Sequence, residues 1–177
     1  YDNGICRMDG MAMVTTLDGL PNNTIWSGLR DRNGDLWFGT SAGLVHLKNG
    51  VVMPLPPTVS AQEQPVLSLL EGADGTLWCG MREGLMGLHT DGRITHHVAG
   101  PNGPGRSVRS LWQDSYGHLW MATDNGLVRM NGARFDRWTT AQGLSDNTVQ
   151  CLLADPKGRL WIGTANGLSC MDGGVFR

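Results

Sequence analysis

The chain has 177 residues, of which 40% are apolar, and its formal net charge at pH 7 is −2. This composition is typical of a globular protein, and the near-neutral charge excludes the basic surface with which proteins bind nucleic acids or anionic membranes. No stretch reaches the roughly 18 apolar residues that a membrane-spanning helix needs. The sequence opens inside a repeat rather than on a signal peptide, so we expect it to be part of a longer protein.

A motif built around a tryptophan recurs at a nearly constant interval. It reads Asp-x-x-Gly-x-Leu-Trp, then an apolar residue, Gly and Thr, and after two more residues Gly-Leu. The second copy departs from it, with Gly72 in place of the aspartate and Met81 in place of the threonine. An interval of this size is typical of repeat proteins. The tryptophans are spaced by 41, 42 and 41 residues and are Trp37, Trp78, Trp120 and Trp161.

Each copy contains short apolar runs that we interpret as four strands, A to D. In the first full copy they cover 24–29, 36–40, 44–47 and 51–55, and Asn-Gly pairs supply two of the turns between them. Asn-Gly between apolar runs indicates a hairpin, because both residues tolerate a positive φ. Four antiparallel strands in 41 or 42 residues are typical of a β-propeller blade. We therefore predict an all-β fold, a β-propeller of four-stranded antiparallel blades.

The predicted propeller covers the whole chain and shows no sustained helical period. In its third full copy we place strand A at 107–113. The blades are a partial one at 1–16 and four more at 20–58, 62–99, 104–140 and 145–177, the last with a truncated D strand.

Strand B is apolar on both faces, whereas a strand with one wet face would alternate. We therefore expect each strand B to lie in a blade packed between neighbours, with the tryptophans wedged between blades. Gly39, Gly80 and Gly163 are expected to make room beside the tryptophans, and Ala122 takes that place in the third copy.

Residues 19–44 resemble the two-component regulator propeller repeat. The resemblance rests on Gly-Leu-Pro-Asn-Asn-Thr-Ile and, four residues later, Arg-Asp-x-x-Gly-Asp-Leu-Trp-Phe-Gly-Thr-x-x-Gly-Leu, and residues 143–168 echo this pattern. It implies a periplasmic sensor region of a membrane-anchored bacterial receptor, ahead of a membrane helix and a cytoplasmic histidine kinase or diguanylate cyclase. It also implies a larger propeller, completed by further blades of the parent chain or by another copy. It carries over no catalytic residue.

The charged B–C turns are the candidate ligand-binding positions. Arg82-Glu83 and Asp124-Asn125 occupy turns in which the other copies carry smaller, less charged residues. The B–C turns and the D–A connections share one end of a propeller, and loops on a rigid scaffold are where binding residues gather. By position, the same end or the inner strand also holds Gln64, Arg106, Arg109 and Trp112.

No pattern predicts a metal or a cofactor. His96 and His97 point to opposite faces of a strand, so they do not converge on an ion, and His118 is expected on a turn surface. The turn aspartates are expected to cap the A–B turns rather than bind calcium, and they are Asp31, Asp35, Asp114 and Asp155. Without a Cys-x-x-Cys pair, all the cysteines are expected to be unpaired packing residues, namely Cys6, Cys79, Cys151 and Cys170.

The favoured hypothesis is a non-catalytic extracytoplasmic sensor segment of a bacterial signal-transduction receptor. It would bind an unknown small molecule, an oligosaccharide or a protein partner on its loop face, without nucleic acid, cofactor or direct membrane contact. The sequence holds no Gly-x-Ser-x-Gly, Walker or dinucleotide motif. The alternatives are a propeller enzyme, a lyase or hydrolase of the streptogramin-lyase type with its site in the central funnel, and a scaffold for protein partners.

Overall fold

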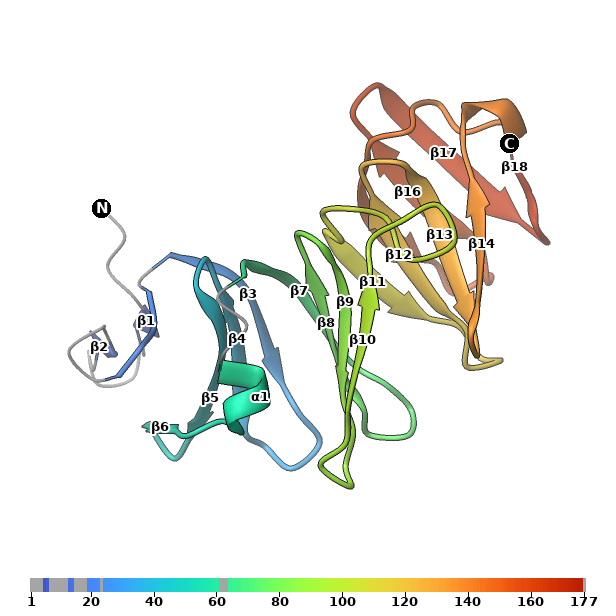
Figure 1. Cartoon of the computed structure of the whole chain (residues 1–177). Coiled ribbons are helices and arrows are strands. Elements are labelled where there is room, and N and C mark those ends of the chain that lie inside the picture. The colour runs from blue at the N-terminus through green and yellow to red at the C-terminus, as the bar shows by residue number, and fades with distance from the viewer. Residues whose placement is uncertain (1–4, 7–12, 15–18, 23, 61–63, 177) are drawn as a thin grey trace.

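The computed structural model describes residues 5–6, 13–14, 19–22, 24–60 and 64–176. They form four four-stranded antiparallel sheets, which Figure 1 shows side by side in chain order, from blue to red. A two-stranded ladder of β1 (Ile5–Cys6) and β2 (Met13–Val14) precedes them. This architecture confirms the predicted all-β fold with four-stranded antiparallel blades.

Each sheet is one blade, and its strands pair in chain order. Blade 1 consists of β3 (Ile25–Arg30), β4 (Leu36–Thr40), β5 (Gly43–Lys48) and β6 (Val51–Met53). Blade 2 consists of β7 (Val66–Glu71), β8 (Leu77–Met81), β9 (Gly84–Leu88) and β10 (Ile94–Val98). Blade 3 consists of β11 (Ser110–Gln113), β12 (Leu119–Thr123), β13 (Gly126–Asn131) and β14 (Arg134–Trp138). Blade 4 consists of β15 (Val149–Ala154), β16 (Leu160–Thr164), β17 (Gly167–Asp172) and β18 (Val175–Phe176).

The turn aspartates fasten each A–B turn to the tryptophan of strand B. Asp114 Oδ1 accepts hydrogen bonds from the backbone N–H groups of Tyr116 and His118, and Oδ2 accepts one from Trp120 Nε1, each at 2.9 Å. Asp31 and Asp155 make the same set of bonds in blades 1 and 4. These bonds confirm the predicted turn capping and add to it a link from turn to core.

Two turns depart from that arrangement. Asp35 accepts from Lys48 and lies 3.1 Å from His46 Nε2, so it ties the turn to β5 rather than capping it. In blade 2, where Gly72 replaces the aspartate, Asp74 caps the turn through the backbone N–H and the hydroxyl of Thr76.

The hydrophobic core lies between the blades. Leu85 of blade 2 is 2% exposed and packs with Val108 and Met121 of blade 3. The equivalent leucines of blades 1 and 3, Leu44 and Leu127, pack on the blades that follow them in the same way. Burying each such leucine contributes about 1.5–3 kcal/mol. The repeat therefore folds by stacking, and each blade depends on its neighbour for a core.

The glycine of strand B sits where two blades approach most closely. A Cβ atom on Gly80 would lie 2.5 Å from the carbonyl oxygen of Val108 and 2.2 Å from Ser68 Oγ, a hydroxyl that donates to this carbonyl at 2.8 Å. Gly39 meets Ser27 and Val66 in the same way. Gly39 and Gly80 therefore make room for the following blade, and the atoms nearest to them are not those of the tryptophans beside which the room was predicted.

Strand A of blade 3 is shorter than predicted. It begins at Ser110 rather than at residue 107. Ser107 has a φ of 51°, in the left-handed region, and its N–H donates to Arg82 O at 2.8 Å. This hydrogen bond ties Ser107 to the B–C turn of blade 2, and the backbone changes direction here before strand A begins at Ser110.

The connections contain short helical segments, α1 (Pro57–Ser60) and the 3₁₀ turn η2 (Thr140–Gln142), which agree with the absence of a sustained helical period, and η2 carries a capping box of Thr139 and Gln142. The expectation for the cysteines needs correction. Cys79 and Cys170 are buried and unpaired as predicted, but Cys151 is exposed, because no blade in the described part of the chain covers its face of β15. The side chain of Cys6 lies outside the described residues. No helix among the described residues is long and apolar enough to span a membrane.

Candidate ligand-binding site

The B–C turns of blades 2 and 3 meet at one end of the sheets, and the predicted binding residues gather there. Arg106 Nε lies 3.1 Å from Glu83 Oε2, and the two side chains are 67% and 44% exposed. The Arg109 guanidinium contacts the Asp124 carboxylate, and both are half-buried. The structure therefore brings the predicted charges together as two ion pairs. Glu83 of blade 2 pairs with Arg106 of the connection, and Arg109, just before β11, pairs with Asp124 of blade 3.

Backbone hydrogen bonds hold these turns in place. The N–H of Asp124 donates to Arg106 O at 3.1 Å, and the N–H of Ser107 donates to the carbonyl of Arg82. The Arg82 side chain is exposed. Because exposed ion pairs contribute only about 0–1 kcal/mol, Glu83 and Arg106 exchange partners at low cost. A charged ligand arriving at this end can therefore take either group.

Arg137 is the residue of this end that sequence reasoning missed. From β14 its Nη2 donates to the carbonyls of Gly100 and Gly103 at 3.2 and 3.1 Å, and its Nη1 donates to Asn125 O at 3.1 Å. Burial lowers the pKa of its guanidinium. Arg137 thus fastens the glycine- and proline-rich connection to the B–C turn of blade 3. The backbone carbonyls of the loop at 100–105 need hydrogen-bond donors, but the sequence does not show which residue supplies them.

A pocket of about 420 Å³ opens between this connection and the turn. Arg106, Asn125 and Arg137 supply its polar lining, and Ala99, Pro101 and backbone glycines supply the rest. Of the predicted site residues, Arg106 and Asn125 line the pocket, whereas Arg82, Glu83, Arg109 and Asp124 lie outside it. The pocket offers guanidinium donors and carbonyl acceptors without a nucleophile or a pair of carboxylates.

Trp112 lies on β11, the inner strand and one of its two predicted places, but it borders the end opposite the B–C turns. It sits two residues before the A–B turn of blade 3 and lines a different cleft together with Asp114 and Trp120. Gln64 is at the B–C end as expected, because it precedes Pro65, whose carbonyl accepts the N–H of Arg82 at 3.3 Å.

The histidines do not converge. His97 is half-buried and its ring lies 5.4 Å from that of Phe135, whereas His96 is exposed, in keeping with opposite faces of β10. His118 is half-buried rather than on the turn surface, and its Nδ1 lies 2.9 Å from Asp114 Oδ2. Within the described residues, no three His, Cys, Asp or Glu side chains stand close enough to hold a metal ion.

The comparison with protein families matches two stretches of the chain. The family model for the two component regulator propeller matches residues 19–42 and residues 143–166. The chain carries two-component regulator propeller repeats. The two stretches are the same parts of the repeat, namely the polar entry, strand A, the A–B turn and strand B of blades 1 and 4.

Solved structures extend the comparison beyond the two matched repeats. The extracellular domain of BT4673 from B. thetaiotaomicron, described in one structure as a one-component and in another as a hybrid two-component system, is 31% identical over 86% of this chain, with a TM-score of 0.72. The extracellular domain of BT3049 from the same organism is 21% identical over 94% of this chain, with a TM-score of 0.79. The chain spans only 22% and 24% of those two domains.

More distant neighbours share the fold alone. Virginiamycin B lyase from Staphylococcus aureus is 16% identical over 89% of this chain and 56% of its own, with a TM-score of 0.67. Among curated proteins, no match was found. The regulator propeller repeats are therefore supported by the family match and by a solved relative, whereas the lyase likeness speaks only for blade geometry.

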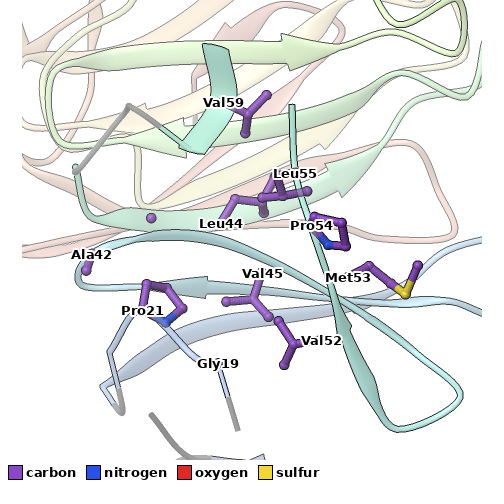
Figure 2. Close-up of a pocket in the computed structure, with 11 residues that line it drawn as sticks. Gly19, Pro21, Ala42, Leu44, Val45, Val52, Met53, Pro54, Leu55 and Val59 are labelled. Carbon is purple, nitrogen blue, oxygen red and sulfur yellow. The ribbon is translucent and has the colours of Figure 1, made fainter. Parts of the chain in front are cut away.

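The first regulator propeller repeat also borders an apolar pocket of about 380 Å³, which Figure 2 shows in close-up. Val45, Val52 and Leu55 line it together with Pro21 and Val59 of α1. No ionisable side chain is among its lining residues. This pocket can take apolar groups, but it holds no group that could perform chemistry.

Proposed function

We propose that this chain is a non-catalytic sensor segment of the extracytoplasmic propeller of a bacterial signal-transduction receptor. The observation that carries the proposal is the 31% identity, over 86% of this chain, with the extracellular domain of BT4673, which its structures describe as a one-component or a hybrid two-component system. The regulator propeller repeats support the same assignment. Binding of a ligand or a protein partner then takes place on loops that the blades hold rigidly.

The B–C end of blades 2 and 3 is the binding surface that we favour for this role. It combines an exposed ion pair, Arg106 with Glu83, and a pocket closed on one side by the half-buried side chain of Arg137. Positive donors of this kind hold carboxylate or phosphate groups with fixed geometry. An anionic group on a small molecule, an acidic oligosaccharide or a protein partner fits this surface.

An enzymatic role has less support. Each of the inner strands β3, β7 and β15 carries a bulge, and the bulged residues are, in that order, Trp26, Leu67 and Gln150. Arg109 holds the equivalent place just before β11. Only Arg109 of these four side chains is titratable, and Asp124 pairs with it. General acid–base chemistry needs two groups of matched pKa at the reacting atoms. The described inner positions do not supply such a pair.

The proposal is tested in the parent receptor by reversing one exposed charge. Arg106→Glu places like charges beside Glu83, and we expect the ligand-dependent output of the receptor, measured with a reporter of its target gene, to fall about tenfold or more. The matched control is Arg93→Glu, since Arg93 is 62% exposed and pairs with Asp91 in the β9–β10 turn at the other end. Equal responses of both variants would count against the B–C end. Turnover of a lactone or a streptogramin by the purified chain would overturn the non-catalytic assignment.

A further inference from the structure

A second cleft lies at the opposite end of the sheets, in the valley between blades 3 and 4. Its volume is about 690 Å³, against about 320 Å³ for the equivalent valley between blades 1 and 2. The A–B turns of blades 3 and 4 and the β17–β18 turn border it, so it shares no residue with the pocket at the B–C end. The β17–β18 turn has two residues, Gly173 and Gly174, where the β9–β10 turn has five, so both the shorter turn and the side chains contribute to the larger volume.

A polar latch crosses the other two valleys. In the A–B turn of blade 1, the backbone N–H of Arg32 donates to Glu71 Oε2 at 2.8 Å, and its guanidinium binds the other oxygen of Glu71 and the Gly72 carbonyl. One blade on, the N–H of Ala73 donates to Gln113 Oε1 at 2.8 Å. In both cases the last residue of strand A reaches back to the turn of the preceding blade.

The latch is missing between blades 3 and 4. The two positions are taken by Ser115 and Ala154, as the alignment of the turns and of the strand ends shows. Neither side chain is long enough to cross the valley, and no hydrogen bond between them is found. The valley consequently stays open and becomes the largest of the clefts described here.

Aromatic side chains surround the open valley, and three of them are specific to blade 3. Trp112 stands where the other blades have Leu29, Leu70 and Leu153 opposite the motif tryptophan. Trp138 takes the place of His97 in blade 2, and Tyr116, 85% exposed, takes the place of turn residues that are polar elsewhere. The ring centroid of Trp120 lies 6.4 Å from that of Trp112 and 5.2 Å from that of Trp138.

The charges at the valley are already compensated by the protein. Arg129 Nη2 donates to Asp136 at 2.8 Å, and Asp155 accepts from Arg159 Nε at 2.7 Å. Asp114 accepts from Trp120 Nε1. An arriving charge would therefore have to break an existing pair, which disfavours a charged ligand. Arg129 also lines the valley, with its guanidinium over the rings of Trp120 and Trp138, and its Nε has no hydrogen-bond partner among the described residues. A ligand hydroxyl that approaches Arg129 could supply that partner.

We propose that this valley is a binding site for an uncharged ring with an apolar face and a hydroxylated edge. The flat face would stack on Trp112, whose ring offers a large apolar area at low conformational cost. The Trp138 ring, which stacks on Trp120 and lies under the Arg129 guanidinium, would form the wall of the site. The hydroxyl edge would reach Arg129 and the turn residues Ser115 and Tyr116. The volume lies within the usual range of about 300–1,000 Å³ for small-molecule sites. A pyranose ring and a phenolic ring both have this chemistry.

The test measures binding to the purified chain by quenching of tryptophan fluorescence. Cellotetraose and maltotetraose probe the sugar source, and phenol and 4-hydroxybenzyl alcohol probe the phenolic source. We expect saturable binding with one probe class. Trp112→Leu, which installs the residue of the other blades, and Ser115→Arg with Ala154→Glu, which rebuilds the latch, should each weaken it about tenfold or more.

The control is the valley between blades 1 and 2. Arg32→Ser with Glu71→Ala removes its latch but adds no aromatic ring, so no new binding is expected there. Thermal denaturation shows whether each variant is folded. The proposal is overturned if no probe of either class saturates, or if folded Trp112→Leu and latch variants bind as the wild type does. Because binding is measured on the isolated chain, its outcome is independent of the receptor output that tests the sensor function.

Discussion

The aspartate of the A–B turn does more than its place in the turn requires. Asp114 is mostly buried, and burial alone would raise the pKa of its carboxyl, but donors from Trp120 and His118 outweigh this and lower the pKa. One oxygen of the carboxylate thus accepts the hydrogen bonds that cap the turn, and the other accepts the hydrogen bond from the core tryptophan. A neutral side chain of the same shape cannot satisfy both sets of donors.

We expect Asp114→Asn to lower the free energy of unfolding at pH 7 by about 2–3 kcal/mol, because bonds to a charged acceptor are lost and the amide group faces a donor. The sign of the pH dependence follows from the lowered pKa. Asp114 stabilises the fold fully above the ordinary aspartate pKa of about 3.9, and this contribution disappears as the pH falls through the folded-state pKa. Urea denaturation of both proteins at several pH values should therefore show curves that converge below about pH 4.

Asp91→Asn is the matched control for this change. Asp91 also caps a turn, accepting from the N–H of Arg93 at 2.9 Å, but it is exposed and bonds no core side chain. Its replacement should change stability little. A loss in Asp114→Asn that stayed the same from pH 7 to pH 3 would show that the charge of Asp114 is not its cause.

At the scale of the element, the blade is a repeat whose fit depends on the next blade. The fourth residue of strand B lies close to the following blade, and at Gly39 and Gly80 there is no space for a side chain. Blade 3 solves the same problem with Ala122, which is fully buried. The interface of blades 3 and 4 therefore accommodates a methyl group that the interface of blades 2 and 3 does not.

We expect Gly80→Ala to destabilise the fold by about 1–3 kcal/mol, as overpacking of a core does. The added methyl group would meet the Val108 carbonyl, which is backbone and cannot turn away. Gly163→Ala is the matched change in blade 4, where the near neighbour is the exposed Cys151 sulfur, a side chain that is free to rotate. Comparable losses for the two variants in urea denaturation would contradict the role of the blade interface.

The repeat made the elements predictable, and the differences between copies made the sites hard to predict. The turn aspartates, strand B and the interface glycines recur with fixed spacing, so each copy supports the interpretation of the others. Arg137 could not be found in this way, because two of its three carbonyl partners lie in a loop more than thirty residues away. Trp112 lies on the inner strand, one of its two predicted places, but a residue inside a strand can serve either end and only the structure shows that it borders the A–B end.

At the scale of the whole molecule, blade 4 presents a face that every earlier blade buries. Leu168 is 62% exposed, whereas its equivalents Leu127, Leu85 and Leu44 are 0%, 2% and 7% exposed under the blade that follows each. Two further exposed side chains, Leu153 (68% exposed) and Cys151, lie on β15, the strand A of blade 4. An apolar sheet face of this kind is a site of association. We propose that another blade covers it, from the parent chain or from a second copy.

The isolated chain should therefore self-associate, and Leu168→Ser should weaken that association. Because Leu168 is exposed in the single chain, the substitution should leave stability almost unchanged, within about 0.5 kcal/mol. Leu127→Ser in the same position of blade 3 should instead cost about 3 kcal/mol or more, since it buries a hydroxyl and leaves a cavity. Sedimentation equilibrium over a range of concentrations separates the cases. A wild-type chain that stays monomeric at all concentrations would show that the face of blade 4 does not drive association, whereas a concentration-dependent mass that Leu168→Ser reduces would place the contact on β17.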